Sequence, residues 1–366
     1  MSKPIGLYVH IPFCNGKCPY CDFYSECDVS LADAYTEAVI AEMVGARQEN
    51  IAADTLYLGG GTPPLLGVQN LVRIIDAARE YYSFDGEATL EANPCSVTPK
   101  MLSALREAGY NRISFGMQSA VAEELAVLGR KHTPEQVRFA VESAKRAGFD
   151  NLSLDLMLGI PHQTSESVKY SLDTAIELNV QHISAYMLKI EENTDFYRKK
   201  RWEDCPDEEQ TCEIYLSTIE YLRQAGFMQY EISNFAKPGM ECSHNLKYWR
   251  CEEYLGFGPA AHGYFGGVRY GHGRDLKRYL ADAAQTVSVT DDAPGSFAEY
   301  AMLRLRLNDG VLLPEAESRY GQAVRQMADK AKRYEKTGLL TVSPDRIALT
   351  PRGFLVSNEL IGQLVL

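Results

Sequence analysis

Three cysteines near the amino terminus limit what this chain can be more than any other part of its sequence. Cys14, Cys18 and Cys21 are spaced Cys-x-x-x-Cys-x-x-Cys within the stretch YVHIPFCNGKCPYCDF. Thiolates at this spacing can wrap one metal centre, and a [4Fe-4S] cluster is normally held by four of them. Three thiolates therefore predict a cluster with one iron left open to bind a small molecule. The alternative is a zinc site, which needs a fourth ligand such as His10 or Cys27.

The composition is that of an ordinary globular protein with a surplus of acidic residues. The chain has 366 residues, of which 45% are hydrophobic and 23% are charged, and its formal net charge is −12. This charge argues against sequence-independent binding to nucleic acid, which depends on Lys and Arg neutralising phosphates. Lys199, Lys200 and Arg201 form a local basic run, which we interpret as a solvated face.

The amino terminus and the cysteine content predict a cytosolic location. The first residues, MSKPIGLYVHIPF, lack the apolar run of a signal peptide. The chain contains no stretch of about 18 uninterrupted apolar residues, the length that a membrane-spanning helix requires. Nine cysteines fit a reducing compartment in which disulfides are rare, so we assign no disulfide.

Short apolar strands alternate with helical patterns through the first two thirds of the chain. Strands are expected at residues 6–12, 55–58, 88–92, 111–115, 152–156 and 182–187, and helices at 31–48, 71–82, 99–109 and 208–224. Such alternation indicates parallel strands joined by right-handed crossovers. Six units predict an α/β fold with an incomplete (β/α)6 barrel, in which chemistry sits at the carboxyl ends of the strands.

The remaining sequence divides into two further parts. We predict the barrel over residues 1–236, a glycine- and aromatic-rich extension over 237–290, and a carboxyl-terminal domain over 291–366 that begins with the linker-like run DDAPGS. In this last part, helices are expected at 297–307, 323–336 and 351–359, with a hairpin at 338–350. This order predicts a small winged-helix-like α+β domain. We interpret it as a cap over the open side of the barrel rather than as a DNA-binding unit.

The cysteine spacing resembles that of the radical S-adenosylmethionine (SAM) superfamily, whose members bind SAM at the open iron of a [4Fe-4S] cluster. YVHIPFC followed by CPYCDF is similar to the branch that contains anaerobic coproporphyrinogen III oxidase and the HemW-type haem chaperones. The resemblance covers nearly the whole chain. It implies a [4Fe-4S] cluster and SAM as cofactors, with Cys14, Cys18 and Cys21 as the cluster ligands.

The resemblance also implies which residues contact SAM. The turn LYLGGGTP resembles the motif that binds the SAM amino group, and it contains Gly60, Gly61 and Thr62. Glycines let a backbone approach a ligand closely, although an ordinary strand-to-helix turn would also explain them. The other matching positions are Tyr8, Glu91, Gln118, Arg130 and Asp155. Carboxylates at strand ends suit ribose hydroxyls and an arginine can pair with a carboxylate, but each residue alone could equally be structural.

Two features favour the chaperone over the oxidase within this branch. Phe23 stands where the oxidase has a fourth cysteine, so the oxidase pattern is broken. The leader is also short, because only seven residues precede Tyr8, whereas the oxidase carries a longer amino-terminal arm.

A third feature is the sequence HNLKYW, which begins at His244 and matches the HNxxYW motif of the chaperones. Haem requires an axial donor and an apolar, aromatic wall, so the resemblance implies His244 as a haem ligand. The alternative is a helix start in which the aromatic residues of the motif pack against the barrel. His262 and His272 are further candidate ligands.

The sequence therefore leads to the hypothesis of a haem chaperone that binds a [4Fe-4S] cluster, SAM and haem. It would deliver haem to haem-requiring partners such as respiratory enzymes. The hypothesis includes no nucleic acid partner, and leaves open a homodimer, peripheral membrane contact through the partners, and productive cleavage of SAM. The rivals are oxygen-independent coproporphyrinogen oxidation and a zinc-stabilised scaffold without redox chemistry.

Overall fold

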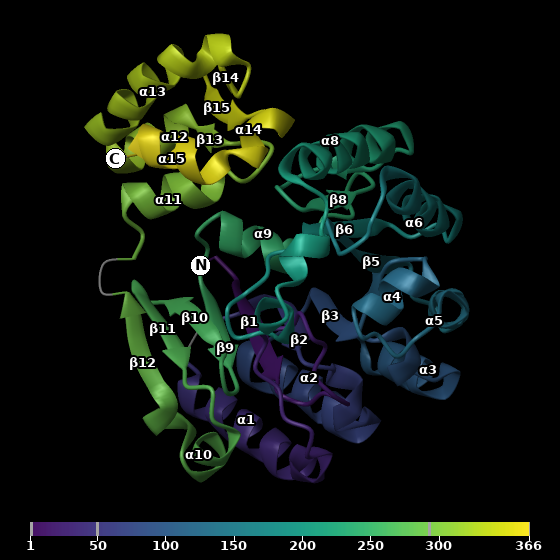
Figure 1. Cartoon of the computed structure of the whole chain (residues 1–366). Helices are drawn as coiled ribbons and strands as arrows, with labels where there is room; N and C mark the ends of the chain where they lie inside the picture. Colours follow the sequence, from purple (N-terminus) through teal and green to yellow (C-terminus); the bar gives the residue numbers. More distant parts are fainter. Residues whose placement is uncertain (1–2, 49–50, 292–293, 366) are drawn as a thin grey trace.

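The computed structural model describes residues 3–48, 51–291 and 294–365 and is built around one open sheet (Figure 1). Its order is β12-β11-β10-β9-β1-β2-β3-β4-β5-β6-β8-β7. The six strands from β1 to β6 run parallel to one another, and the sheet does not close. This confirms the predicted incomplete barrel.

The ends of the parallel strands lie within three residues of their predicted positions, and β6 has its predicted bounds. They are β1 (Ile5–Ile11), β2 (Ala53–Gly60), β3 (Glu87–Ala92), β4 (Arg112–Gln118), β5 (Asn151–Leu158) and β6 (His182–Met187). The main helices that cover them are α1 (Ala32–Ala46), α2 (Val68–Tyr82), α3 (Pro99–Ala108), α4 (Ala122–Val127), α5 (Pro134–Arg146), α6 (Ser165–Glu177) and α8 (Glu208–Gln224), with the short α7 (Asp195–Arg198) before α8. Thr133, Thr164 and Asp207 form capping boxes that start α5, α6 and α8.

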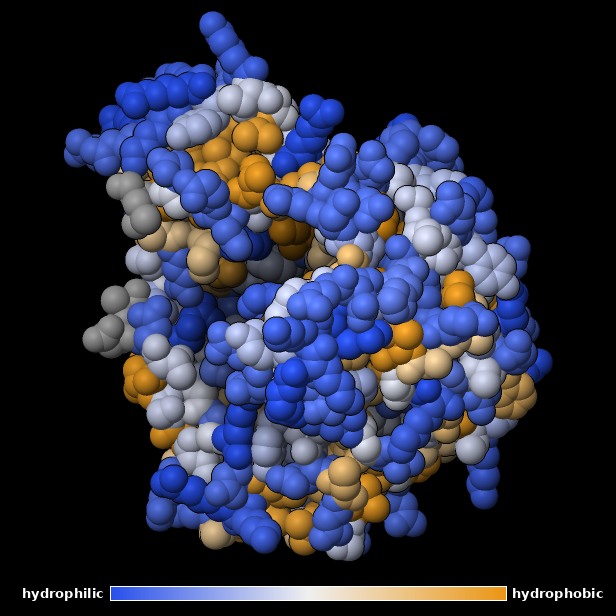
Figure 2. Space-filling model, viewed as in Figure 1, coloured by the Kyte–Doolittle hydropathy of each residue, from blue (hydrophilic) through white to orange (hydrophobic). Residues whose placement is uncertain are grey.

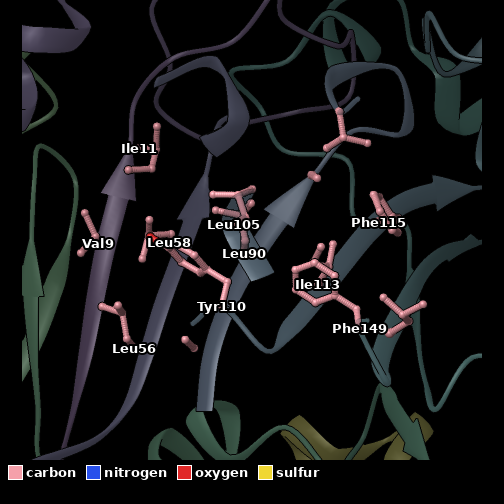
Figure 3. Close-up of a cluster of buried hydrophobic side chains, with 14 of the residues drawn as sticks. Val9, Ile11, Leu56, Leu58, Leu90, Leu105, Tyr110, Ile113, Phe115 and Phe149 are labelled. Atoms are coloured by element: carbon pink, nitrogen blue, oxygen red, sulfur yellow. The ribbon is translucent and has the colours of Figure 1, made fainter. Parts of the chain in front are cut away.

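The alternation of side chains along the strands separates a dry outer face from a polar inner one. Figure 3 shows Val9, Leu56, Leu90 and Ile113 on successive strands, packed with Leu105 from α3. Burying each such side chain stabilises the fold by about 1.5–3 kcal/mol. Because neighbouring residues of a strand point to opposite faces, the residues between these apolar positions face into the barrel.

The extension predicted over residues 237–290 belongs to the same sheet. It contributes helix α9 (Ser243–Trp249), strands β9 (Tyr254–Phe257), β10 (His262–Phe265) and β11 (Val268–His272), helix α10 (Leu276–Ala281) and strand β12 (Val287–Asp291). Strand β9 pairs in parallel with β1, and β10 to β12 follow as antiparallel strands. At the opposite edge, β8 (Asn234–Ala236) and β7 (Met228–Gln229) continue from β6. These strands were not predicted.

The carboxyl-terminal domain has the predicted hairpin and helices at the predicted places, but the last predicted helix is divided into two and one further helix is present. Its elements are α11 (Phe297–Arg304), β13 (Val311–Leu312), α12 (Leu313–Tyr320), α13 (Gln322–Tyr334), β14 (Leu340–Val342), β15 (Arg346–Leu349), α14 (Pro351–Leu355) and α15 (Ser357–Val365). Helix α12 and the short β13 were not predicted. Part of the predicted linker, residues 292–293, lies outside the described residues.

This domain contacts both ends of the open sheet. Near β8, the Ile232 N–H donates to the Arg306 carbonyl at 3.0 Å, and the Asn308 N–H donates to the Tyr230 carbonyl at 2.9 Å. Near the other end, Arg269 of β11 forms a 2.6 Å ion pair with Glu299 of α11. Figure 2 shows a hollow between the carboxyl-terminal domain and the barrel. In the described part of the chain, no helix is long and apolar enough to cross a membrane.

One buried carboxyl group lies where the two parts meet. Glu231 is 1% exposed and pairs with Leu307 in an isolated β-bridge. Its Oε1 accepts the Ser233 N–H at 3.2 Å, but burial still raises the pKa of this carboxyl from 4.5 to about 7. The folded protein therefore retains this proton over a pH range in which the unfolded chain has lost it.

We predict that Glu231→Gln removes part of the pH dependence of stability. The stability associated with the raised pKa is present below pH 4.5 and is lost as the pH rises to about 7. As the pH rises from 4.5 to 8, the free energy of unfolding of the variant should increase relative to that of the wild type by up to about 3 kcal/mol. Urea unfolding at both pH values measures this difference. A difference between the two proteins that does not change with pH would contradict the prediction.

Candidate cofactor site at the carboxyl ends of the strands

The cysteine loop follows β1 at the carboxyl end of the barrel. The Cys14 N–H donates to the Glu26 carbonyl at 2.9 Å, which closes the base of the loop. Gly16 has a φ of 103°, a conformation that favours glycine. The Cys21 N–H donates to the Cys18 carbonyl at 3.0 Å, so the last two cysteines share one tight turn. All three thiols are free and partly exposed.

The charges around these thiols suit thiolate ligands. Burial raises the pKa of the Cys21 thiol. The nearby thiols of Cys18 and Cys14 raise it further, and Lys17 lowers it, so the three sulfurs lie within electrostatic range of one another. Arg130 also approaches the loop, with its Nη1 3.8 Å from the Cys18 Sγ. Burial is the largest effect on the pKa of Cys21, so its net shift is upward, and the two cations supply countercharge for thiolates that bind a metal centre. The donor set therefore fits an iron–sulfur cluster held by three cysteines.

The zinc alternative does not fit this arrangement. In the part of the chain that the structure describes, no three His, Cys, Asp or Glu side chains converge as ligands of a single metal ion. His10 is 4% exposed and uses both ring nitrogens, with Nδ1 3.0 Å from the Tyr8 hydroxyl and Nε2 3.0 Å from the Tyr24 carbonyl. Cys27 is exposed outside the turn that holds the other three cysteines.

The glycine turn after β2, residues 59–62, is hydrogen-bonded to the backbone that leads into the cysteine loop. The Gly61 N–H donates to the Ile11 carbonyl at 2.8 Å, and the Thr62 N–H donates to the Phe13 carbonyl at 2.7 Å. A Cβ on Gly61 would lie 2.4 Å from that same Phe13 oxygen, and one on Gly60, whose φ is 105°, would lie 2.6 Å from the His10 ring. Close packing within the protein thus accounts for these glycines. Their effect is to fix the loop against β2.

Glu91 lies directly beside this turn. Its Oε1 accepts the Tyr57 hydroxyl at 2.7 Å, and its Oε2 accepts the Gly60 N–H at 3.1 Å. Burial, followed by the nearby Asp155 carboxylate, raises the pKa of Glu91 to about 7 despite these bonds. A buried carboxyl group with a raised pKa at a strand end is typical of a functional site.

A polar chain joins Arg130 to the two sides of the site. Its Nη2 donates to the Asn93 Oδ1 and, at 2.9 Å, to the Gly116 carbonyl. Asn93 in turn donates from Nδ2 to the Thr62 Oγ1 at 2.9 Å, and this oxygen lies 3.6 Å from the Cys14 Sγ. Asn93 was not predicted as a site residue, although its place directly after a parallel strand was a signal for it.

The other predicted SAM residues face the same interior. The Ser114 hydroxyl donates to the Asp155 Oδ1 at 2.9 Å, and burial raises the pKa of Asp155. Gln118 ends β4 with a φ of 65°, and its side chain lies beside that of Arg130, because a Cβ on Gly116 would meet both. Tyr8 lies one strand away from Tyr57, with ring centroids 6.3 Å apart. The structure thus gathers all the predicted SAM residues around one polar interior.

His244 does not fit the prediction that it coordinates haem. Its ring is 0% exposed, with Nδ1 2.8 Å from the Thr55 Oγ1 and Nε2 2.7 Å from the Tyr248 hydroxyl. It stacks on Tyr57, with ring centroids 5.2 Å apart. Burial lowers the pKa of His244 to about 3, so the ring is neutral. Both nitrogens are therefore occupied inside the protein.

The motif around His244 closes the amino-terminal end of the barrel. Glu87 of β3 accepts the N–H groups of Ser243 and His244, each at 3.2 Å, and so caps the start of α9. The structure therefore agrees with the alternative explanation of the HNLKYW motif, a helix start packed against the barrel. The capping group, however, is Glu87 rather than a residue of the motif.

The fold and the cysteine loop agree with two sequence families. A sequence model of the Radical SAM superfamily matches residues 8–175, and one of the HemN C-terminal domain matches residues 297–356. A solved structure of coproporphyrinogen III oxidase (HemN) from Escherichia coli is similar with a TM-score of 0.85 at 24% identity, covering 99% of this chain and 90% of that one. The chain thus has the architecture of a radical SAM protein.

Curated relatives narrow this class to one family. A protein named Heme chaperone HemW from Mycobacterium tuberculosis is 35% identical over 100% of this chain and 95% of its own length. Relatives of the same name are 37% identical in Bacillus subtilis, covering 98% of both chains, and 36% identical in Escherichia coli, covering 98% of this chain and 97% of that one. The chain therefore belongs to the HemW family of the radical SAM superfamily.

We predict that Cys18→Ser abolishes binding of the cluster. The variant removes one of only three thiolates, so iron and sulfide bound after anaerobic reconstitution should fall to near background, together with the broad absorption near 400 nm that iron–sulfur clusters show. The matched control is Cys27→Ser, which removes an exposed thiol next to the same loop. Equal loss of iron in both variants would show that the loop residues do not form a specific site.

We predict a structural role for His244 that can be measured without any ligand. His244→Ala leaves the Thr55 and Tyr248 hydroxyls without their partner in the core, and should lower the free energy of unfolding by about 2–4 kcal/mol. His162→Asn is the matched control. His162 is exposed and has a φ of 64°, a conformation that asparagine tolerates better than alanine, so this replacement should change stability by less than about 0.5 kcal/mol. Urea denaturation of both variants tests this difference, and similar values for the two would contradict it.

Proposed function

We propose that this protein is a haem chaperone that carries a [4Fe-4S] cluster and SAM and delivers haem to haem-requiring proteins such as respiratory enzymes. The observation that carries the proposal is full-length similarity to proteins named heme chaperone, together with a three-cysteine loop at the carboxyl end of a radical SAM barrel. Radical SAM chemistry itself is supplied by the cluster, which can reduce and cleave SAM when both are bound.

In this proposal the chain's own residues have separate tasks. Cys14, Cys18 and Cys21 hold the cluster, and Arg130 and Lys17 stabilise the thiolates. This assignment is supported by the grouping of free, partly exposed thiols near two cations.

The SAM site is proposed around the interior next to this loop. The contacting residues are Tyr8, Gly60, Gly61, Thr62, Glu91, Gln118, Arg130 and Asp155. SAM carries an ammonium, a carboxylate and ribose hydroxyls, so it needs donors and acceptors of both charges. Glu91 and Asp155 offer carboxylate oxygens and Arg130 offers a guanidinium, all within one enclosed polar region.

The oxidase remains the rival function, and one residue argues against it. Phe23 occupies the position of the fourth cysteine in the oxidase pattern and is 64% exposed, so no sulfur is present there. The similarity to the oxidase structure, at 24% identity, concerns the fold alone.

A joint assay on anaerobically reconstituted full-length protein tests the proposed function. We expect about four irons per chain, binding of SAM, a Soret change on titration with haemin, and no consumption of coproporphyrinogen III in the presence of SAM and a reductant. Absence of any Soret change would remove the haem function. Turnover to protoporphyrinogen with release of carbon dioxide would establish the oxidase instead.

A further inference from the structure

A histidine that coordinates haem must present a free ring nitrogen to the ligand. Five of the seven histidines of the chain are buried: His10, His132, His182, His244 and His272. The two exposed histidines are His162, in the loop after β5, and His262, at the start of β10. Within the described residues, the ring of neither exposed histidine makes a hydrogen bond.

His262 stands between two glycines on the sheet. It pairs with Gly271 of β11, and on its other side lies Gly256 of β9, at which a Cβ would come within 1.9 Å of the His262 carbonyl. Gly256 itself pairs with Tyr8 of β1. Neighbouring strands lie about 4.8 Å apart, so a side chain at either neighbouring position would lie next to His262. Both positions are glycine, Gly256 and Gly271, and carry no side chain.

The orientation of the ring leaves one nitrogen open. A Cβ on Gly271 would lie 2.8 Å from both Cε1 and Nδ1 of His262, so this edge of the ring lies over the glycine. Nε2 lies at least 3.3 Å from this position and forms no hydrogen bond within the described residues. Partial burial, followed by Arg274, His272 and Arg269, lowers the pKa of His262. The ring is therefore neutral at physiological pH, which is the state that binds iron.

The surroundings of His262 suit the rest of a haem molecule. Tyr264, two residues along β10, carries Arg269 over its ring at 4.8 Å, and Arg269 also reaches the Tyr254 hydroxyl at 3.4 Å. Arg274 lies in electrostatic range on the other side. Tyr264 and Tyr254 are each 7% exposed and offer a porphyrin only an edge, and Arg269 is already paired with Glu299. Arg274 is therefore the arginine that can pair with a propionate.

This region adjoins the candidate cofactor site. Arg274 forms a 3.3 Å ion pair with Asp22, which directly follows the last cysteine of the cluster loop. The pKa of His10, whose ring lies against the Gly60 turn, is lowered by burial and also by Arg274 and His262. A ligand on His262 would therefore lie next to the loop and the turn proposed to hold the cluster and SAM.

We infer that His262 is the axial ligand of haem in this protein, and that strands β9, β10 and β11 form the face on which haem docks. The inference rests on the proposed function and deepens it. Nε2 of His262 coordinates the iron, and the exposed Arg274 pairs with a propionate. The buried His244 acts by shaping the barrel beneath and does not touch the ligand.

Titration of the reconstituted protein with ferric haemin tests this inference. For the wild type we expect a shifted Soret band. For His262→Ala we expect at least about tenfold weaker binding and loss of the histidine-ligated spectrum, with iron content and far-ultraviolet circular dichroism unchanged. His162→Ala is the matched control, because it removes the other exposed histidine, and should bind as the wild type does. Added imidazole should restore the histidine-like spectrum of His262→Ala, an effect that a merely structural role would not produce.

The outcomes separate this inference from the proposed function. A wild type that does not bind haemin overturns both. A His262→Ala variant that binds haemin with the wild-type spectrum and affinity overturns the inference alone, as does loss of the histidine-ligated spectrum in His162→Ala. Loss of that spectrum in a folded His244→Ala variant, with His262→Ala unaffected, would assign the ligand to the motif helix and also overturn the inference.

Discussion

Strand β1 pairs in parallel with β2 along one edge and with β9 along the other, so a single seven-residue strand joins the two parts of the sheet. Its carboxyl end leads directly into the cysteine loop. Two backbone hydrogen bonds from Gly61 and Thr62 then tie the start of that loop to the turn after β2. The position of the thiols is therefore set by backbone pairing, which does not depend on the rotamer of any side chain. The same strand places Tyr8 and His10 on the inner face.

The inner face carries charge at positions that an ordinary sheet would fill with apolar residues. Arg112 is 1% exposed, and its Nε and Nη1 find no hydrogen-bond partner in the described residues. Burial also raises the pKa of Glu91 and Asp155. Buried groups of this kind are costly unless they are paired. The apolar contacts between the outer face and the helices offset that cost, so stability and chemistry are divided between the two faces of the same strands.

The sequence was most informative where the signal was local. Helix α8 has its predicted bounds because Asp207 and Gln210 form a capping box next to an amphipathic pattern. The six parallel strands followed from their apolar runs. The strands from β9 to β12 were missed because glycines and aromatic residues interrupt the alternation of that stretch, and because their pairing with β1 joins residues far apart in the chain.

The candidate site shows the same division between local and distant information. The cysteines are close in sequence, and their spacing was sufficient to predict a cluster. His244 was assigned to haem because a short motif cannot reveal burial. Two of the residues that enclose its ring, Thr55 and Tyr57, belong to strand β2. Thr55 precedes His244 by 189 residues in the sequence. Asn93 was overlooked because its role depends on Arg130 and Thr62, which approach it only in the fold.

The open sheet has a consequence for the size of molecule that the interior can admit. In a closed barrel, the number and stagger of the strands determine the diameter, and hydrogen bonds around the full circle resist any widening. Here the gap between the two edges is spanned by the carboxyl-terminal domain, which is held by the ion pair between Arg269 and Glu299 and by an apolar cluster that includes Tyr215 of α8. The width of the interior therefore depends on side-chain packing between this domain and the barrel, and not on a closed ring of strand pairing.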